Sequence, residues 1–312
     1  MANILVTGGA GFVGSNLVNR LLHENHEVSI VDNFSNGLRT NVPNQAKLYE
    51  YDLGDKAWIS SMANTKFDIV IHCAAQSSNA TSFKNPHRDL NDNLLSTLNI
   101  IEFCNAMSIK RIIFTSSMSV YGNTSNFPTK SSTSPLPETF YALHKATSEK
   151  YFHYNPHLNW TIFRLYTTYG AGQNLANREQ GLVKIFLKYI LDNEPVQIHG
   201  SGERIRDIIH VNDVVEAIVL SLNNQVTFGK TYNLGTGQTI LVSEIIAQIY
   251  SNLGIQDPLP SIYGSPDIGD PFKTHADISD INLDLNWKPR ITPEQGISLT
   301  TSNYLPNRKN SM

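Results

Sequence analysis

A glycine-rich turn near the start of the chain constrains the fold more than any other feature. The run Gly8–Gly14 lies between an apolar segment, residues 3–7, and a segment of helical periodicity, residues 13–22. Gly8, Gly11 and Gly14 permit a tight turn at which backbone N–H groups can approach a phosphate, and the helix N-terminus adds partial positive charge. Such turns also occur without a ligand, so the motif alone predicts only a strand, a turn and a helix.

Strand-like and helical segments alternate through the first half of the chain. Strands are expected at residues 27–31, 48–51, 68–73, 111–115 and 161–165, and helices at 89–107 and 141–154. This alternation predicts the α/β class, with a doubly wound parallel Rossmann sheet covered by helices on both faces. Further helices are expected at 180–191, 212–223, 242–253 and 293–304.

We therefore expect two interleaved units. Residues 1–168 would form the NAD-binding Rossmann domain, its sheet completed by segments near 207–235. Residues 169–312 would form mainly a smaller α/β substrate-binding lobe, because loops and prolines interrupt the strand–helix alternation there.

Composition and charge narrow the possible partners. The chain has 24 basic and 27 acidic residues, and no basic run exceeds two residues, so nucleic-acid binding is not expected. No apolar run approaches the roughly 20 residues that span a bilayer, and Gly8 interrupts the first one, so neither a membrane span nor a signal peptide is expected. Cys73 and Cys104 lie in apolar segments and are interpreted as reduced thiols in a cytoplasmic protein.

The ten histidines do not cluster with the spacing of metal ligands, and no metal site is predicted. His72 continues an apolar strand, so it is expected to pack or hydrogen-bond in the core rather than to bind metal.

An acidic residue follows the glycine turn at the distance that a dinucleotide site requires. Asp32 ends the second predicted strand, 18 residues beyond Gly14, where a carboxylate can accept hydrogen bonds from the adenosine ribose diol. The same carboxylate would repel a 2′-phosphate, so NAD is favoured over NADP. The alternative is that Asp32 is only a turn residue at a strand end.

A tyrosine and a lysine lie four residues apart on a predicted helix. Tyr141 and Lys145 therefore project from one face, and a nearby ammonium is expected to lower the pKa of a phenol toward the working pH of a base. Ser117 follows another predicted strand and can share the same substrate oxygen. The spacing also arises by chance, and the alternative for Ser117 is a turn hydroxyl that satisfies local backbone groups.

In their order along the chain these features resemble the extended short-chain dehydrogenases/reductases that modify nucleotide sugars, in particular UDP-galactose 4-epimerases. Apart from the glycine turn, the matching segments are 32–37, Asp52, 72–76, Asn93, 115–122, Tyr141 with Lys145, 169–170, 200–203, 206–211 and 232–237. The resemblance implies a Rossmann fold, NAD as cofactor and a nucleotide sugar, with a UDP-sugar favoured, as substrate.

The resemblance also implies roles for individual positions. Those around the cofactor are Gly8, Gly11, Phe12, Val13, Gly14, Asp32, Asn33, Asn36, Gly37, Asp52, Leu53, Cys73, Ala74, Ala75, Asn93, Thr115, Tyr141, Lys145 and Tyr166. Those around the substrate are Ser117, Met118, Tyr141, Thr167, Arg206 and Asp267. Arg206 matches an arginine that holds the nucleotide diphosphate, although it would otherwise form an ion pair with Asp207 or Glu203.

The residues beside Ser117 help to distinguish among the reactions that such relatives catalyse. Relatives that are 4,6-dehydratases carry Thr-Asp-Glu at the positions of Ser117, Met118 and Ser119, and decarboxylating relatives carry glutamate at Ser119. Their absence favours a 4-epimerase, in which a transient 4-keto sugar is reduced again on its opposite face. A 4-ketoreductase that consumes reduced cofactor and a regulatory NAD-sensing protein remain as alternatives.

Two positions depart from the pattern of these relatives. Thr167 occupies a position where many have asparagine, and Asp267 lies where they usually bring a second arginine to the diphosphate. The contacts that hold the nucleotide are therefore expected to differ from those in these relatives. By analogy alone, the helices at 89–107 and 141–154 would pair with their copies in a homodimer.

Overall fold

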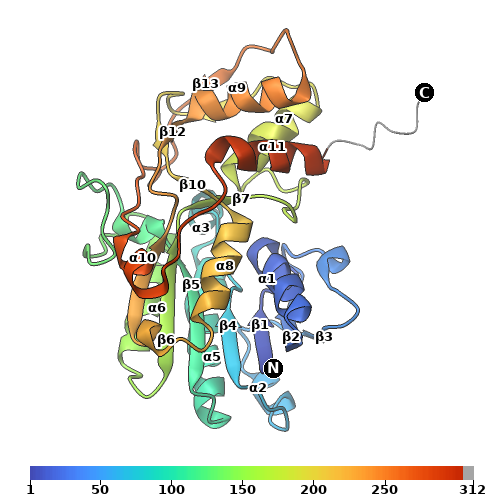
Figure 1. The fold of residues 1–312 in the computed structure, drawn as a ribbon, viewed down its shortest axis with the longest axis vertical. Coiled ribbons are helices and arrows are strands. Elements are labelled where there is room, and N and C mark those ends of the chain that lie inside the picture. The colour runs from blue at the N-terminus through green and yellow to red at the C-terminus, as the bar shows by residue number, and fades with distance from the viewer. Residues whose placement is uncertain (305–312) are drawn as a thin grey trace.

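A parallel sheet of seven strands forms the centre of the computed structural model, which describes residues 1–304 (Figure 1). The strands lie in the order β11-β6-β5-β4-β1-β2-β3, and every neighbouring pair is parallel. Their bounds are β1 (Asn3–Thr7), β2 (Glu27–Asp32), β3 (Lys47–Glu50), β4 (Ile69–His72), β5 (Arg111–Ser117), β6 (Asn159–Leu165) and β11 (Lys230–Leu234). This is the doubly wound α/β fold that the sequence predicts.

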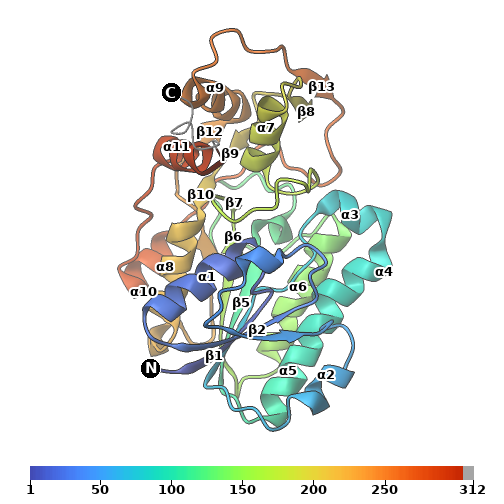
Figure 2. The ribbon, with the colours of Figure 1, turned by 90° about the vertical axis from the view of Figure 1, so that its right-hand side faces the viewer.

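Helices cover both faces of the sheet because successive side chains of a strand point to opposite faces. Ile4 and Val6 belong to the core beneath α1 (Phe12–His23) and α8 (Val211–Ser221), whereas Leu5 belongs to the core beneath α5 (Ser96–Ala106). The second face also carries α2 (Ala57–Ser61) and α6 (Phe140–His153), and α10 (Ser279–Leu285) lies near α8 (Figure 2).

The order of strands reverses between β1 and β4. The chain leaves β1 toward β2 and β3 on one side, and β4 leads to β5 and β6 on the other. Loops that leave adjacent strands in opposite directions open a crevice at the carboxyl edge of the sheet, where ligands of such folds bind. The glycine turn follows β1, and Cys73–Ala75 follow β4.

A smaller α/β unit lies above this edge (Figure 1). Helices α7 (Leu182–Leu191), α9 (Val242–Leu253) and α11 (Pro293–Tyr304) share an apolar core that includes Val183, Ile245 and Ile297. Its strand pairs are β7 (Thr167–Tyr169) with β10 (Ile208–His210), β8 (Gln197–His199) with β13 (Ile262–Gly264), and β9 (Ile205–Arg206) with β12 (Ile240–Leu241). Residues 305–312 of the predicted second lobe lie outside the described residues.

One predicted helix differs from its expectation. The segment expected as a continuous helix at 89–107 consists of α4 (Pro86–Asp89), a π-helical turn (Leu90–Leu95) and α5, preceded by α3 (Asn79–Lys84). The hydroxyls of Ser96 and Thr97 donate to the carbonyl oxygens of Asp92 and Asn93 at 2.7 Å each. Side-chain bonds to carbonyls four residues back compete with helical amides, which accounts for the widened turn.

None of the helices within residues 1–304 is long and apolar enough to cross a membrane.

Candidate functional site

A cavity of about 510 Å³ lies between the carboxyl edge of the sheet and the smaller lobe. Its wall contains every site residue predicted from the sequence except Asn93, which is buried and donates to Asp89 at 2.9 Å. Asn93 therefore lies behind the residues that line the cavity. Residues far apart in the chain, from Gly8 to Asp270, meet at this cavity.

The glycine turn leaves room that only glycine can leave. Gly8 has a φ of +66°, and a Cβ added there would lie 2.7 Å from the backbone nitrogen of Ala74. A Cβ on Gly14 would lie 2.1 Å from the carbonyl oxygen of Gly8. Gly11 precedes α1 and provides no side-chain cap, so the first amides of the helix remain available to a ligand. A closely approached backbone and an uncapped helix N-terminus fit the pyrophosphate of a dinucleotide.

Asp32 already organises the turn against which it lies. Its Oδ2 accepts from the amide of Ala10 at 3.0 Å and its Oδ1 from the amide of Phe34 at 2.8 Å. Burial raises the pKa of Asp32, while these two hydrogen bonds oppose the shift. Each carboxylate oxygen keeps a second lone pair, so the side chain can still accept hydroxyl donors from a ribose.

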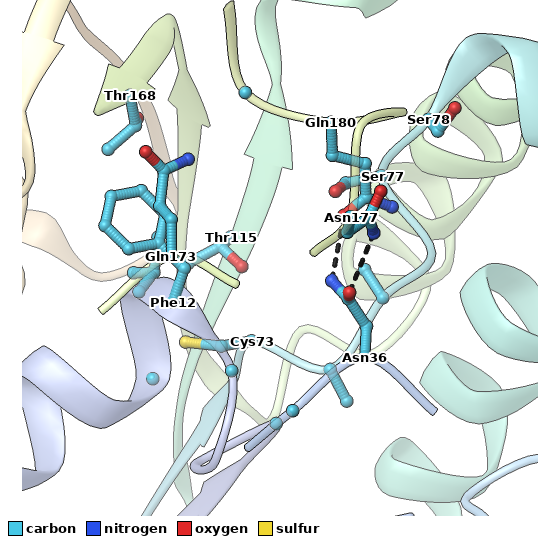
Figure 3. A pocket seen from close by; sticks show the side chains of 18 of the residues that line it. Phe12, Asn36, Cys73, Ser77, Ser78, Thr115, Thr168, Gln173, Asn177 and Gln180 are labelled. Atoms are coloured by element: carbon cyan, nitrogen blue, oxygen red, sulfur yellow. Dashed lines mark hydrogen bonds between the residues drawn. The ribbon is translucent and has the colours of Figure 1, made fainter. Parts of the chain in front are cut away.

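The neighbouring polar residues join the two lobes. Asn36 exchanges hydrogen bonds with two side chains of the segment before α7: Nδ2 of Asn36 donates to Gln180 at 2.9 Å, and Asn177 donates to Oδ1 of Asn36 at 2.8 Å (Figure 3). Asn33 instead donates to Asp52 at 3.2 Å. We call residues 172–181 the strap, because this segment lies against the Rossmann side of the cavity.

The strap is held at further points. Glu179 accepts from Thr81 at 2.7 Å and forms an ion pair with Lys84 at 2.6 Å. The carbonyl oxygen of Gly172 accepts from Asn41 at 3.2 Å. Sequence reasoning missed the strap as part of the site; the signal in the sequence was its two glycines, Gly172 and Gly181, both of which have positive φ.

The predicted catalytic residues converge on the carboxyl end of β5. Tyr141 and Lys145 lie on α6, whose first turn is capped by Thr139, and both side chains are buried. Ser117 ends β5, and its Oγ accepts from the amide and the hydroxyl of Ser119 at 3.2 and 2.9 Å. Nζ of Lys145 donates to the carbonyl oxygen of Thr115 at 3.0 Å.

The pKa values of the pair differ from the sequence-based expectation. Burial raises the pKa of Tyr141 to about 12, and a hydrogen bond with Ser117 opposes this shift only in part. Burial also lowers the pKa of Lys145 to about 8. The expected lowering of the Tyr141 pKa by the ammonium is not found: desolvation disfavours the phenolate, and the charge of Asp89 raises the pKa further.

A buried acid and histidine lie behind this pair. His144, one position before Lys145, has its Nδ1 2.6 Å from Oδ2 of Asp89, and Gln76 donates to Oδ1 of the same carboxylate at 2.7 Å. His144 thus points away from the catalytic pair, as the sequence indicates. His72 is fully buried, with its ring nitrogens 2.7 Å from Thr7 and 3.2 Å from Thr97.

At the far end of the cavity, Arg206 is buried and paired with a residue that the sequence did not indicate. Its guanidinium contacts Asp270 at 2.8 and 2.9 Å, and Asp270 also pairs with Arg204. The two carboxylates considered as alternatives, Asp207 and Glu203, do not pair with Arg206: Asp207 accepts backbone amides instead, including that of Thr236 at 2.7 Å.

Two further predicted substrate positions, Met118 and Thr167, lie in the cavity wall. Asp267 is there too, and its carboxylate lies 2.8 Å from Nδ1 of His199.

The fold and the glycine-lined cavity define a dinucleotide-binding α/β protein. Residues 4–235 match the family described as NAD dependent epimerase/dehydratase. The chain belongs to this family, and the predicted resemblance and NAD as the cofactor are thereby confirmed.

Individual relatives resemble the chain over nearly its whole length. It is 33% identical to a putative UDP-glucose 4-epimerase of Methanocaldococcus jannaschii, over 97% of this chain and 98% of the relative. A solved UDP-glucose 4-epimerase of Thermotoga maritima with UDP-glucose superposes with a TM-score of 0.92 at 32% identity, covering 97% and 98% of the two chains. A UDP-N-acetylglucosamine 4-epimerase of Methanobrevibacter ruminantium, in complex with UDP-N-acetylmuramic acid, gives 0.88 at 29% identity over 97% and 98%.

Proposed function

We propose that this protein is a nucleotide-sugar 4-epimerase that acts on a UDP-sugar. The observation that carries the proposal is the convergence of Ser117, Tyr141 and Lys145 beside Met118 in the cavity wall. This set can move a proton at a sugar hydroxyl, and the positions next to Ser117 offer no carboxylate to expel water. The epimerase relatives of similar length favour a UDP-sugar.

The chain's own residues would hold the cofactor along the carboxyl edge of the sheet. The amides of the glycine turn would hold the pyrophosphate, Asp32 the adenosine ribose, and Asp52 and Leu53 the adenine, and Ala74 would line the path to the nicotinamide. When bound, NAD accepts a hydride from the sugar and returns it. These positions all lie in the cavity wall, which supports the assignment.

Tyr141 acts first as base and then as acid at the hydroxyl on C4. Because its pKa is raised to about 12, the free phenol is protonated at neutral pH. To act as a base it must first lose this proton to solvent, and the hydrogen bond with Ser117 stabilises the resulting phenolate before the proton of the sugar hydroxyl reaches it. Lys145 provides the positive charge from the same helix face. In the second half of the reaction the proton returns to the same oxygen.

The experiment is incubation with UDP-glucose, UDP-N-acetylglucosamine and the corresponding uronic acids, without added reduced cofactor. Proton NMR should show the C4 epimer of at least one of them, and absorbance at 340 nm should show no net change. Accumulation of a ketone or of a deoxysugar, or stoichiometric consumption of reduced cofactor by a 4-keto substrate, would replace the epimerase with a ketoreductase.

We also propose a homodimer formed through α6 and α5. Phe140, Leu143 and Tyr151 on α6 and Tyr154 directly after it are exposed large hydrophobic or aromatic residues at helical spacing, and Leu95 is exposed just before α5. Side chains of this kind on one helix face are typical of an interface. The two helices lie side by side on the outer face of the sheet (Figure 2).

A further inference from the structure

The charges of the cavity wall are unequal. Its acidic residues are Asp32, Asp52, Asp92, Glu179, Asp267 and Asp270, and its cationic residues are Lys145, Lys184 and Arg206. A dinucleotide brings a pyrophosphate to this wall, and the proposed nucleotide sugar brings a second diphosphate. Binding of these phosphates would therefore be favoured most by cations of the wall that do not already have a counter-ion.

Two of the three cations are committed elsewhere. Arg206 is paired with Asp270 through both carboxylate oxygens. Lys145 donates to the carbonyl oxygen of Thr115 beside the catalytic residues. Lys184 is different: it is 2% exposed, and among residues 1–304 no carboxylate lies within ion-pair distance of its ammonium. In the part of the chain that the structure describes, its hydrogen bonds are to the carbonyl oxygens of Asn174 and Asn177 in the strap.

The position of Lys184 on its helix adds to the electrostatic cost of burying its ammonium. It is the third residue of α7, in the first turn of the helix, and the N-cap residue Gly181 provides no side-chain cap. The positive end of the helix dipole repels a cation there and attracts an anion. Burial without a counter-ion lowers the pKa of Lys184 to about 8. An anion at this point would relieve both effects.

A second buried polar group lies on the same strap. Oε1 of Gln173, a residue of the cavity wall, has no hydrogen-bond partner among the described residues (Figure 3). A buried polar atom without a partner is costly unless a ligand satisfies it. The strap and the start of α7 thus bring together a cation without a counter-ion and an amide oxygen without a hydrogen-bond partner among the described residues.

We propose that Lys184 binds a diphosphate group in this cavity. An ammonium with two of its three hydrogens on backbone carbonyls keeps one to donate. The diphosphate is either the pyrophosphate of the cofactor or that of the nucleotide sugar. Assignment of Lys184 to the diphosphate of the nucleotide sugar rests on the proposed function, whereas assignment to the pyrophosphate of the cofactor does not.

The test compares ligands that differ only in their phosphates, in the wild type, Lys184→Met and Lys184→Arg. Calorimetry gives the Kd of UDP and of uridine on NAD-loaded protein, and of ADP and of adenosine on protein without bound nucleotide. In Lys184→Met, the affinity advantage conferred by the phosphates should fall about tenfold in at least one of the two pairs, and Lys184→Arg should keep most of it. Lys188→Met, one turn further along the same helix, where the ammonium pairs with Asp192 outside the cavity wall, should leave both ratios unchanged.

The pair that changes identifies the source. A loss confined to UDP assigns Lys184 to the substrate, and a loss confined to ADP assigns it to the cofactor. If both ratios are unchanged in Lys184→Met, even while all four ligands bind more weakly, Lys184 only pins the strap and the proposal is wrong. A wild type that binds UDP no better than uridine would contradict the proposed function instead, and the ADP pair would still test Lys184.

Discussion

The ammonium of Lys145 donates a hydrogen bond of 3.0 Å to the backbone carbonyl oxygen of Thr115. This bond ties the middle of α6 to β5, the strand that ends in Ser117. A buried charge is thereby held one helical turn from the phenol of Tyr141. Because the hydrogen bond to β5 fixes the position of this charge, removing or neutralising the charge should directly change the rate of proton transfer at Tyr141.

Replacing Lys145 should therefore change both the rate and its pH dependence. Lys145→Met removes the charge that stabilises the Tyr141 phenolate and should lower kcat by about 100-fold. Because the pKa of Lys145 is lowered to about 8, the ammonium is charged below that pH and neutral above it. The wild-type kcat/KM should thus fall above about pH 8, and this descending limb should vanish in Lys145→Met.

The matched control is Lys150→Met, on the exposed part of the same helix, which should keep the wild-type profile. Persistence of the descending limb in Lys145→Met would show that another group titrates there.

Removing the phenol oxygen should stop the reaction while leaving the cofactor in place. Tyr141→Phe keeps the ring that packs at the end of β5 but has no group to accept the proton, so turnover should fall by at least about 100-fold. Bound NAD, measured after denaturation of the purified protein, should remain at the wild-type level. Tyr154→Phe, at an 80% exposed tyrosine beyond the end of α6, is the control. Turnover by Tyr141→Phe close to that of the control would exclude Tyr141 as the base.

The Rossmann half was predictable because its signals are local. Strands such as β1 are continuous apolar runs, and glycine at Gly14 is required by the backbone of Gly8 within the same turn, although Gly8 also approaches the distant Ala74. The pairing of Tyr141 with Lys145 follows from one helical turn. For these positions the sequence and the structure agree.

The far side of the cavity was not predictable in the same way. Arg206 meets Asp270, and Asn36 meets Asn177 and Gln180, across large separations in the chain. Such contacts depend on how the smaller lobe lies over the sheet, which no periodicity encodes. The raised pKa of Tyr141 likewise depends on burial from several elements, so the expected direction was wrong.

The buried charge of Lys184 should be visible in the stability of the protein. Its pKa is lowered to about 8 from 10.5, so between these values the unfolded chain binds more protons than the folded one, and stability rises with pH. Lys184→Met lacks this contribution. The free energy of unfolding of the wild type should therefore rise relative to that of Lys184→Met by about 1–2 kcal/mol between pH 7.5 and 9.5. Denaturant titrations at both pH values measure this, with Lys188→Met as the control. If the difference in the free energy of unfolding between the wild type and Lys184→Met is the same at both pH values, the pKa of Lys184 is not lowered in the folded protein.

The strap should slow the release of the cofactor. The double variant Asn177→Ala/Gln180→Ala removes both partners of Asn36 and should increase the dissociation rate of NAD about 3–10-fold, as expected for one or two exposed hydrogen bonds. Stopped-flow displacement with excess labelled NAD measures the rate. Asn44→Ala, at an exposed asparagine outside the cavity wall, should have no effect. A rate equal to that of the wild type would show that these bonds open freely.

The exposed face of α6 should determine the oligomeric state. Leu143 is 47% exposed on that face, and burying it against a second copy would contribute free energy that a glutamate would abolish by leaving an unpaired charge in an apolar interface. Light scattering after gel filtration should give a dimer for the wild type and a monomer for Leu143→Glu at micromolar concentration. Leu283→Glu, at an 85% exposed leucine on α10, changes the same side chain elsewhere and should remain dimeric. A wild type that is already monomeric would refute the dimer, whereas a Leu143→Glu variant that stays dimeric would move the interface to another surface.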